Sequence, residues 1–155
     1  MKGVYTATIE ITGVTTAQTL LYLKAPADIA VEVLSATVTN GDNDTAEQIV
    51  CELKAVSGVT AATMASAITP TPTEGVVDGG QVASSTVSGN ASAEPHYYEL
   101  THYDKQGVNN LGGYEFVGMP EERIVLKGQT EIGLRTTETI ASTMLIAQIR
   151  FREIG

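Results

Sequence analysis

The sequence predicts an all-β protein, an antiparallel β-sandwich of jelly-roll type, and three observations lead to this prediction. Apolar and polar residues alternate with a period of two through most of the chain. Turn signals rich in Gly, Pro, Asn and Asp separate these stretches about every 8–12 residues. About nine short strands result, which fits a jelly roll, with an immunoglobulin-like sandwich as the alternative.

Three predicted strands occupy the first forty residues. "VYTATIEIT" places Tyr5, Ala7, Ile9 and Ile11 on one face, as in a strand with one buried side. "QTLLYLKA" ends before Pro26, because proline cannot donate to a sheet ladder. In "IAVEVLSATV" the apolar positions change phase after residue 33. This predicts a β-bulge, which would allow one strand to serve both sheets.

The turn "NGDND" (40–44) precedes "AEQIVCELKAV", where Ile49, Cys51 and Leu53 share one face. Its Ala, Glu, Gln and Lys content also permits a helix, but the period of two favours a strand. Cys51 is the only cysteine, so the chain has no internal disulfide. Its apolar neighbours at strand spacing predict a buried, inert thiol.

The region 57–92 is rich in Ala, Ser, Thr, Gly and Pro, which predicts long loops and short edge strands. "AATMASAI" also has the composition of a short helix, whereas "TPTPTEG" cannot be helical. A linker between two domains is the alternative. The segments on either side are each too small to close a core, so we predict a single domain over residues 1–155.

Three further stretches complete the predicted strands. "HYYELTHYD" has aromatic residues on both faces, with Tyr97 and Tyr103 on the same one. After "QGVNNLGG" and a short "YEFVG", the stretches around Ile124 and Ile132 are predicted to pair across a turn at 127–128. The last strand presents one apolar face, formed by Leu145, Ala147, Ile149 and Phe151.

Charge and hydropathy limit the partners that we expect. The chain has 18 acidic and 9 basic residues and a formal net charge of −9, so phosphate backbones repel it and no nucleic-acid binding is expected. Neither a signal peptide nor an apolar run long enough to cross a bilayer is visible. We therefore expect no membrane association.

Residues for catalysis or metal binding are scarce. On a regular strand His96 and His102 lie about 20 Å apart, at roughly 3.3 Å per residue, which is too far to share a metal. Glu121 and Glu122 are adjacent and point apart, unlike the carboxylate pair of a glycosidase. The 40–44 turn lacks the Gly and Glu positions of an EF-hand, although a loose calcium site is an alternative. We expect no enzyme activity, no cofactor and no metal.

The last strand is apolar on its second face too, where Met144 and Ile146 precede Gln148 and Arg150. A solvated face is usually polar throughout, so this pattern predicts contact with another subunit. The predicted interface residues are Met144, Ile146 and Arg150, with Tyr97 and Tyr103 as second candidates. The alternative is that the 57–92 region covers this strand.

Three stretches carry a resemblance to a known family. They are the opening from Tyr5 to Asn40, with "AQ" at 17–18 and "APAD" at 25–28, then "PEERI" at 120–124, and the ending "FREIG". Together they resemble the capsid decoration (cement) proteins of tailed bacteriophages, of the small jelly-roll kind. Arg152 stands where those endings more often carry an acid.

The resemblance implies a structural protein of the virion, on the outer surface of the capsid, made in the cytoplasm of the bacterial host. Such proteins form homotrimers, clamp adjacent capsomers of the major capsid protein and have no active site. The N-terminal segment and residues 69–75 are the expected capsid contacts. Two alternatives are another virion component, such as a head-fibre base or tail-associated protein, and a jelly-roll module that binds host-surface glycans.

Overall fold

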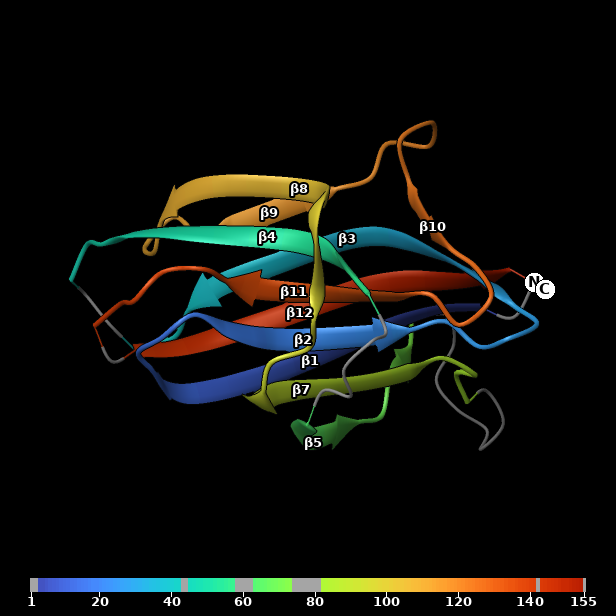
Figure 1. Cartoon of the computed structure of the whole chain (residues 1–155), viewed down its shortest axis with the longest axis horizontal. Coiled ribbons are helices and arrows are strands. Elements are labelled where there is room, and N and C mark those ends of the chain that lie inside the picture. The colour runs from blue at the N-terminus through green and yellow to red at the C-terminus, as the bar shows by residue number, and fades with distance from the viewer. Residues whose placement is uncertain (1–2, 43–44, 58–62, 74–81, 142, 155) are drawn as a thin grey trace.

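The computed structural model describes residues 3–42, 45–57, 63–73, 82–141 and 143–154, and these form strands and turns with no helix. The strands make two antiparallel sheets that pack face to face, which confirms the predicted all-β sandwich. Figure 1 shows the start of β1 and the end of β12 at the same end of the molecule.

Sheet A contains both ends of the described chain, and its strand order is β10-β3-β12-β1-β6, with β9 also paired to β3. The last strand thus lies between the first and the third, paired antiparallel with both. The members of sheet A are β1 (Gly3–Val14), β3 (Ala30–Asn40), β6 (Thr71–Pro72), β9 (Tyr114–Val117), β10 (Ile124–Leu126) and β12 (Thr143–Ile154).

Sheet B has the order β5-β7-β2-β11-β4-β8. Successive strands from β1 to β4 alternate between the two sheets, so neither sheet is built from one contiguous part of the chain. The members of sheet B are β2 (Gln18–Lys24), β4 (Gln48–Val56), β5 (Thr63–Ile68), β7 (Thr86–Ala93), β8 (Tyr97–Asn109) and β11 (Glu131–Thr136).

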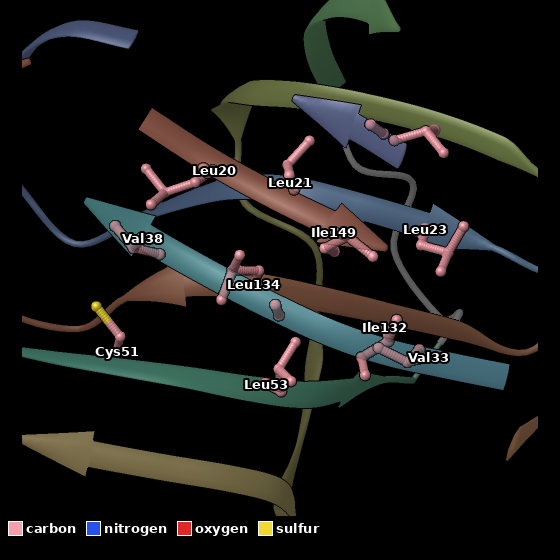
Figure 2. Close-up of a cluster of buried hydrophobic side chains, with 14 of the residues drawn as sticks. Leu20, Leu21, Leu23, Val33, Val38, Cys51, Leu53, Ile132, Leu134 and Ile149 are labelled. Atoms are coloured by element: carbon pink, nitrogen blue, oxygen red, sulfur yellow. The ribbon is translucent and has the colours of Figure 1, made fainter. Parts of the chain in front are cut away.

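The inward faces of the sheets meet in a largely aliphatic core. Figure 2 shows Val33, Val38 and Ile149 of sheet A meeting Leu21 and Leu134 of sheet B, and all five are fully buried. Each such side chain contributes about 1.5–3 kcal/mol relative to an exposed one. The period of two predicted for β1, β4 and β12 is therefore confirmed. The burial of the apolar side chains that follow this period is the main source of stability.

The phase change predicted near residue 33 is a β-bulge in β3. Arg150 of β12 pairs with Ser35 and Phe151 pairs with Val33, so Leu34 is the extra residue. The bulge keeps apolar side chains pointing inward on both sides of it. However, β3 lies in sheet A throughout, so the expectation that this strand serves both sheets is wrong.

The predicted pairing of the stretches around Ile124 and Ile132 is also wrong. β10 pairs with β3 in sheet A, whereas β11 pairs with β2 and β4 in sheet B. The turn between them carries the chain from one sheet to the other. Alternation within a strand reveals its buried face but not the strand beside it, which is why the sequence favoured a simple hairpin.

The region 57–92 contains more strand than predicted. β5 forms where "AATMASAI" also permitted a helix, and both β5 and β6 are edge strands. β7 has β5 on one side and β2 on the other, so it is an interior strand. Residues 58–62 and 74–81 of this region lie outside the described residues.

The connection from β7 to β8 passes over the outer face of sheet B, across β2, β11 and β4 (Figure 1). We call residues 94–101, which comprise this connection and the start of β8, the crossing segment. Its anchor is Tyr97, whose ring lies over Gly133 of β11. A Cβ atom at position 133 would be 2.0 Å from the Tyr97 hydroxyl oxygen. Gly133 is thus required for space rather than for backbone conformation.

Replacing Gly133 should therefore displace Tyr97. We expect Gly133→Ala to lower the free energy of unfolding by about 1–3 kcal/mol, because the added methyl group overlaps the tyrosine ring. Urea denaturation followed by circular dichroism measures this loss.

Gly107→Ala in β8 is the matched control, because nothing lies within 4 Å of a Cβ there, and it should change stability by less than about 0.5 kcal/mol. In a Tyr97→Ala background the effect of Gly133→Ala should shrink. An undiminished effect in that background would contradict the assignment.

Candidate functional site

Three of the five predicted interface residues share the outer face of sheet A, which we call face A. Met144, Ile146 and Arg150 alternate with the buried residues of β12 and point away from the core. Ile146 lies opposite Thr39 of β3, and Arg150 is exposed. Face A is therefore the surface on which the sequence predicts contact with another subunit.

The two apolar members of this set are partly covered by the chain itself. A Cβ atom at Gly41 would lie 2.3 Å from the terminal methyl of Met144 and 3.5 Å from Cδ1 of Ile146. The turn after β3 thus packs against Met144, and both side chains are half-buried. Among the described residues, this turn covers Met144 and Ile146. The alternative drawn from the sequence was that the region 57–92 covers them.

An ion cluster lies at the other end of face A. The carboxylate of Glu32 accepts hydrogen bonds from Arg152 Nε at 3.1 Å and Arg123 Nη1 at 3.3 Å, and Arg152 Nη2 also contacts it. Glu32 is 16% exposed, so the cluster is only partly hydrated. Arginine at position 152 therefore pairs favourably with Glu32 in this chain, whereas an acidic residue there would repel the same carboxylate.

Exposed aliphatic residues surround this cluster. Val125 lies opposite Glu32 on β10, Ile154 follows Arg152 on β12, and Val117 is on β9. Together with Met119, in the turn between β9 and β10, they are 40–61% exposed. These four residues form what we call the aliphatic patch of face A. Sequence reasoning missed it, because its members lie on three strands and one turn.

The two sheets differ in the kind of cation that they present. Arg123, Arg150 and Arg152 belong to face A, and among the described residues its strands present no lysine there. The outer face of sheet B, face B, presents Lys24, Lys54 and Lys105, and Arg135 is its only arginine among the described residues. Arginine enrichment and lysine depletion are typical of protein–protein interfaces.

Tyr97 is a structural anchor in this chain rather than a surface residue. It is 8% exposed, its hydroxyl lies 2.7 Å from Thr19 Oγ1, and the Arg135 guanidinium sits 4.8 Å from its ring centroid. Burial raises its pKa above the ordinary tyrosine value. The monomer leaves little of Tyr97 for a partner to contact.

Glu94 fastens the same segment to β2. Its carboxylate accepts hydrogen bonds from the backbone N–H of Thr19 at 2.7 Å and from Thr19 Oγ1 at 2.5 Å. On the far side, the carbonyl of His96 accepts from Ser57 N at 2.8 Å. The first half of the crossing segment, residues 94–97, is therefore held by contacts to β2, β11 and Ser57.

Glu52 is the most buried carboxylate of face B, with 2% of its side chain exposed. His102 Nδ1 lies 2.9 Å from it, Lys105 Nζ 3.8 Å and Arg135 Nε 3.8 Å. These contacts join β4, β8 and β11 electrostatically. Removing Lys105 or Arg135 would leave this buried carboxylate with less compensation for its charge, which is costly in a protein interior.

The two histidines are not brought together. His102 faces Glu52, while His96 Nδ1 contacts the carbonyl of Tyr97 at 3.4 Å. Asp104, two residues after His102, accepts a hydrogen bond from Tyr114 Oη at 2.7 Å, which ties β8 to β9. In the described part of the chain no group of three or more His, Cys, Asp or Glu side chains is placed to hold a metal ion.

Tyr103 lies on face B, not beside the other interface candidates. It is 41% exposed and lines a cavity together with Tyr98, which is 53% exposed. Regular alternation put Tyr98 on the face opposite to Tyr103. The register of β8 against β4 shifts at both places where these tyrosines occur, so the two line one cavity.

Comparison with known proteins gives no match to a family model, a curated protein or a solved structure. Among the described residues, the structure has no helix that is long and apolar enough to cross a membrane.

The contacts of Glu94 give a first prediction for this region. Glu94→Ala leaves the buried Thr19 N–H without its acceptor and should cost about 1–3 kcal/mol of stability. Hydrogen exchange should accelerate at the Thr19 amide and in the crossing segment. Glu99→Ala, an exposed carboxylate of the same segment, is the control. Equal exchange in both variants would show that Glu94 does not fasten the segment.

Cys51 gives a prediction for alkaline pH. It is fully buried, as the sequence predicted, and burial raises its pKa from 9.0 to about 12. Iodoacetamide at about pH 8 should alkylate it roughly a thousandfold more slowly than in the unfolded chain. The neutral thiol is favoured in the folded state, so its contribution to stability is present below pH 9 and is lost toward pH 12. Native and urea-unfolded labelling rates that coincide would contradict this burial.

Proposed function

We propose that this chain is a structural protein of a bacteriophage virion that decorates the outside of the head as a homotrimer and clamps adjacent capsomers. The observation that carries the proposal is the composition of face A. An arginine–glutamate cluster ringed by exposed aliphatic residues is a surface suited to protein contact.

The places that carry the family resemblance support the proposal, because they come together in the fold. The opening stretch forms β1, β2 and β3, and the final stretch ends β12, which lies between β1 and β3. Residues 120–124 lead into β10 beside β3. The resemblance therefore includes the central strands β3, β12 and β1 of sheet A, together with β2 of sheet B and the approach to β10.

The strand order supports the finer assignment to a jelly roll. Sheet A contains the order β1-β12-β3, with β9 and β10 both paired to β3, and sheet B contains the order β2-β11-β4-β8. Each sheet thus alternates strands from the first and the second half of the chain. Two four-membered sets with this interleaving are what a jelly roll of two Greek keys requires.

Face A is the proposed contact surface between subunits. Val117 and Met119 are each 61% exposed, a large apolar exposure for positions that flank a sheet edge. Burying the aliphatic patch in a closed three-fold ring would also cover the edge strands β9 and β10. Arg150 and the Glu32 cluster would then supply directional contacts within the same surface.

The opposite edge of sheet A is the proposed side of capsid contact. β6 pairs with β1, Thr6 lying opposite Thr71, so the N-terminal segment and part of residues 69–75 form one edge. Residues 74 and 75 lie outside the described residues. A single edge built from both segments is a more coherent contact surface for the major capsid protein than two separate loops.

Another virion component, such as a head-fibre base or a tail-associated protein, would be found at one vertex or on the tail. Labelling of intact virions therefore separates it from a decoration protein spread over the head. A binding module is favoured by one observation only, the tyrosine-lined cavity of face B.

The association state tests the proposed interface. Light scattering behind a sizing column, over a dilution series, should give about three times 16.3 kDa for the native chain. The double variant Val117→Asp, Val125→Asp should move the mass toward the monomer, because it places carboxylates in the aliphatic patch. The double variant Met144→Asp, Ile146→Asp tests the half-buried end of face A by the same measurement of mass.

Leu100→Asp on face B is the matched control, since Leu100 is 93% exposed and the variant should keep the trimer. A trimer that survives both face A variants would contradict the interface. The decoration role is tested separately by adding the protein to purified heads of its own phage that lack it. Failure to bind those heads would contradict the role itself.

A further inference from the structure

A cavity of about 590 Å³ opens on face B, at the end of sheet B where β4 finishes. Its walls come from Ala55 to Ser57, from the crossing segment and β8, and from the turn between β10 and β11. Pockets that bind small molecules have volumes of roughly 300–1,000 Å³. The cavity therefore has the size of a binding site for a small ligand.

The cavity exists because β8 departs from its ladder. Tyr97 pairs with Val56 and His102 with Lys54, so four residues of β8 face the single residue 55 between them. This bulged stretch carries Tyr98 and Thr101 to the cavity, and a second register shift admits Tyr103. Glu94 and Tyr97 fasten the chain next to Tyr98, and the pairing of His102 with Lys54 and of Asp104 with Leu53 holds the chain on either side of Tyr103.

Polar groups complete the wall on the side of β2 and β11. Glu131 is 12% exposed and lies 2.9 Å from Lys24 Nζ. Tyr22 also hydrogen-bonds to Glu131, and burial, together with this bond, raises the pKa of Tyr22. A carboxylate held from two sides is a preorganised acceptor, and the neighbouring ammonium group is a donor.

The turn adds uncharged hydrogen-bonding groups. Thr130 Oγ1 accepts from the Lys127 N–H at 2.8 Å, which leaves its own hydrogen free to donate to a ligand. Gln129 lines the cavity from a backbone with φ of 66°. Together with Thr101 and Ser57, these groups give hydroxyl and amide functions around two aromatic rings.

From this combination we infer that the cavity binds an uncharged saccharide. Sugar rings present apolar C–H faces that pack on aromatic side chains, and hydroxyl groups that both donate and accept hydrogen bonds. Lys24 and Glu131 compensate each other's charge, so the site favours a neutral ligand over an acidic one. Glu131 is the only carboxylate among the described residues that line the cavity, so the site binds sugar without the carboxylate pair that hydrolysis requires.

This inference goes beyond the proposed function and does not depend on it, since the cavity is formed by one chain and lies on the face opposite to the proposed subunit interface. Saccharide binding can fail while trimer formation and head binding hold, and the reverse is equally possible.

The test is saturation-transfer NMR with a panel of methyl glycosides of glucose, mannose, galactose, N-acetylglucosamine and rhamnose, with glucuronic acid as a charged comparison. We expect saturation of at least one neutral glycoside. Tyr103→Ala and Tyr98→Ala should each weaken its binding by roughly tenfold, because each removes one stacking ring.

Leu100→Ala is the matched control, because Leu100 lies between the two tyrosines in sequence and is not part of the cavity wall. It should bind like the native chain, and Tyr103→Phe should retain most of the affinity. Unchanged thermal unfolding excludes misfolding as the cause of any loss. A silent neutral panel, a preference for glucuronic acid, or binding that survives both alanine substitutions would overturn the inference.

Discussion

The insertion of β12 between β1 and β3 is the constraint on which the rest of the structure depends. The last described residues of the chain supply the central strand of sheet A, so this sheet has no continuous inner face until the two ends of the chain have met. The core of sheet B in turn needs that face to pack against. Such a topology is dominated by contacts between distant residues, and folding of this kind is slow relative to that of helical proteins.

This constraint explains both the success and the failure of sequence reasoning about the fold. A period of two reports whether a residue points inward, and it located the buried positions of β1, β3, β4 and β12 correctly. It also exposed the bulge at Leu34, because a bulge breaks the period. It cannot report which strand lies beside which, so it predicts a hairpin around β10 and β11 although these strands belong to different sheets.

The candidate site shows the same limit in another form. The period correctly places Met144, Ile146 and Arg150 on one outward face, because they occur on one strand, and their contact with another subunit stays a prediction. Tyr97 and Tyr103 were grouped by the same rule and are separated by the fold, since β8 shifts register twice between them. The aliphatic patch could not be found at all, because its residues converge only through the pairing of β9, β10 and β12 with β3. A Gly that is needed for space under Tyr97 likewise leaves no trace in a pattern of apolar residues.

The two outer faces have compositions suited to different partners, and the sandwich keeps them apart. Stacked sheets lie about 10 Å from each other, so face A and face B point in opposite directions. If face A is buried between subunits, face B and its crossing segment remain outside the assembly. The tyrosine-lined cavity would then be repeated on every copy, on the side away from the subunit contacts. Weak binding of a single saccharide becomes strong when many copies are held on one surface, because each further contact forms at high effective concentration. A surface that carries many copies would thus bind saccharide strongly even if each cavity has modest affinity. The arginine-rich contact face and the sugar-sized cavity can therefore serve one function in one small chain.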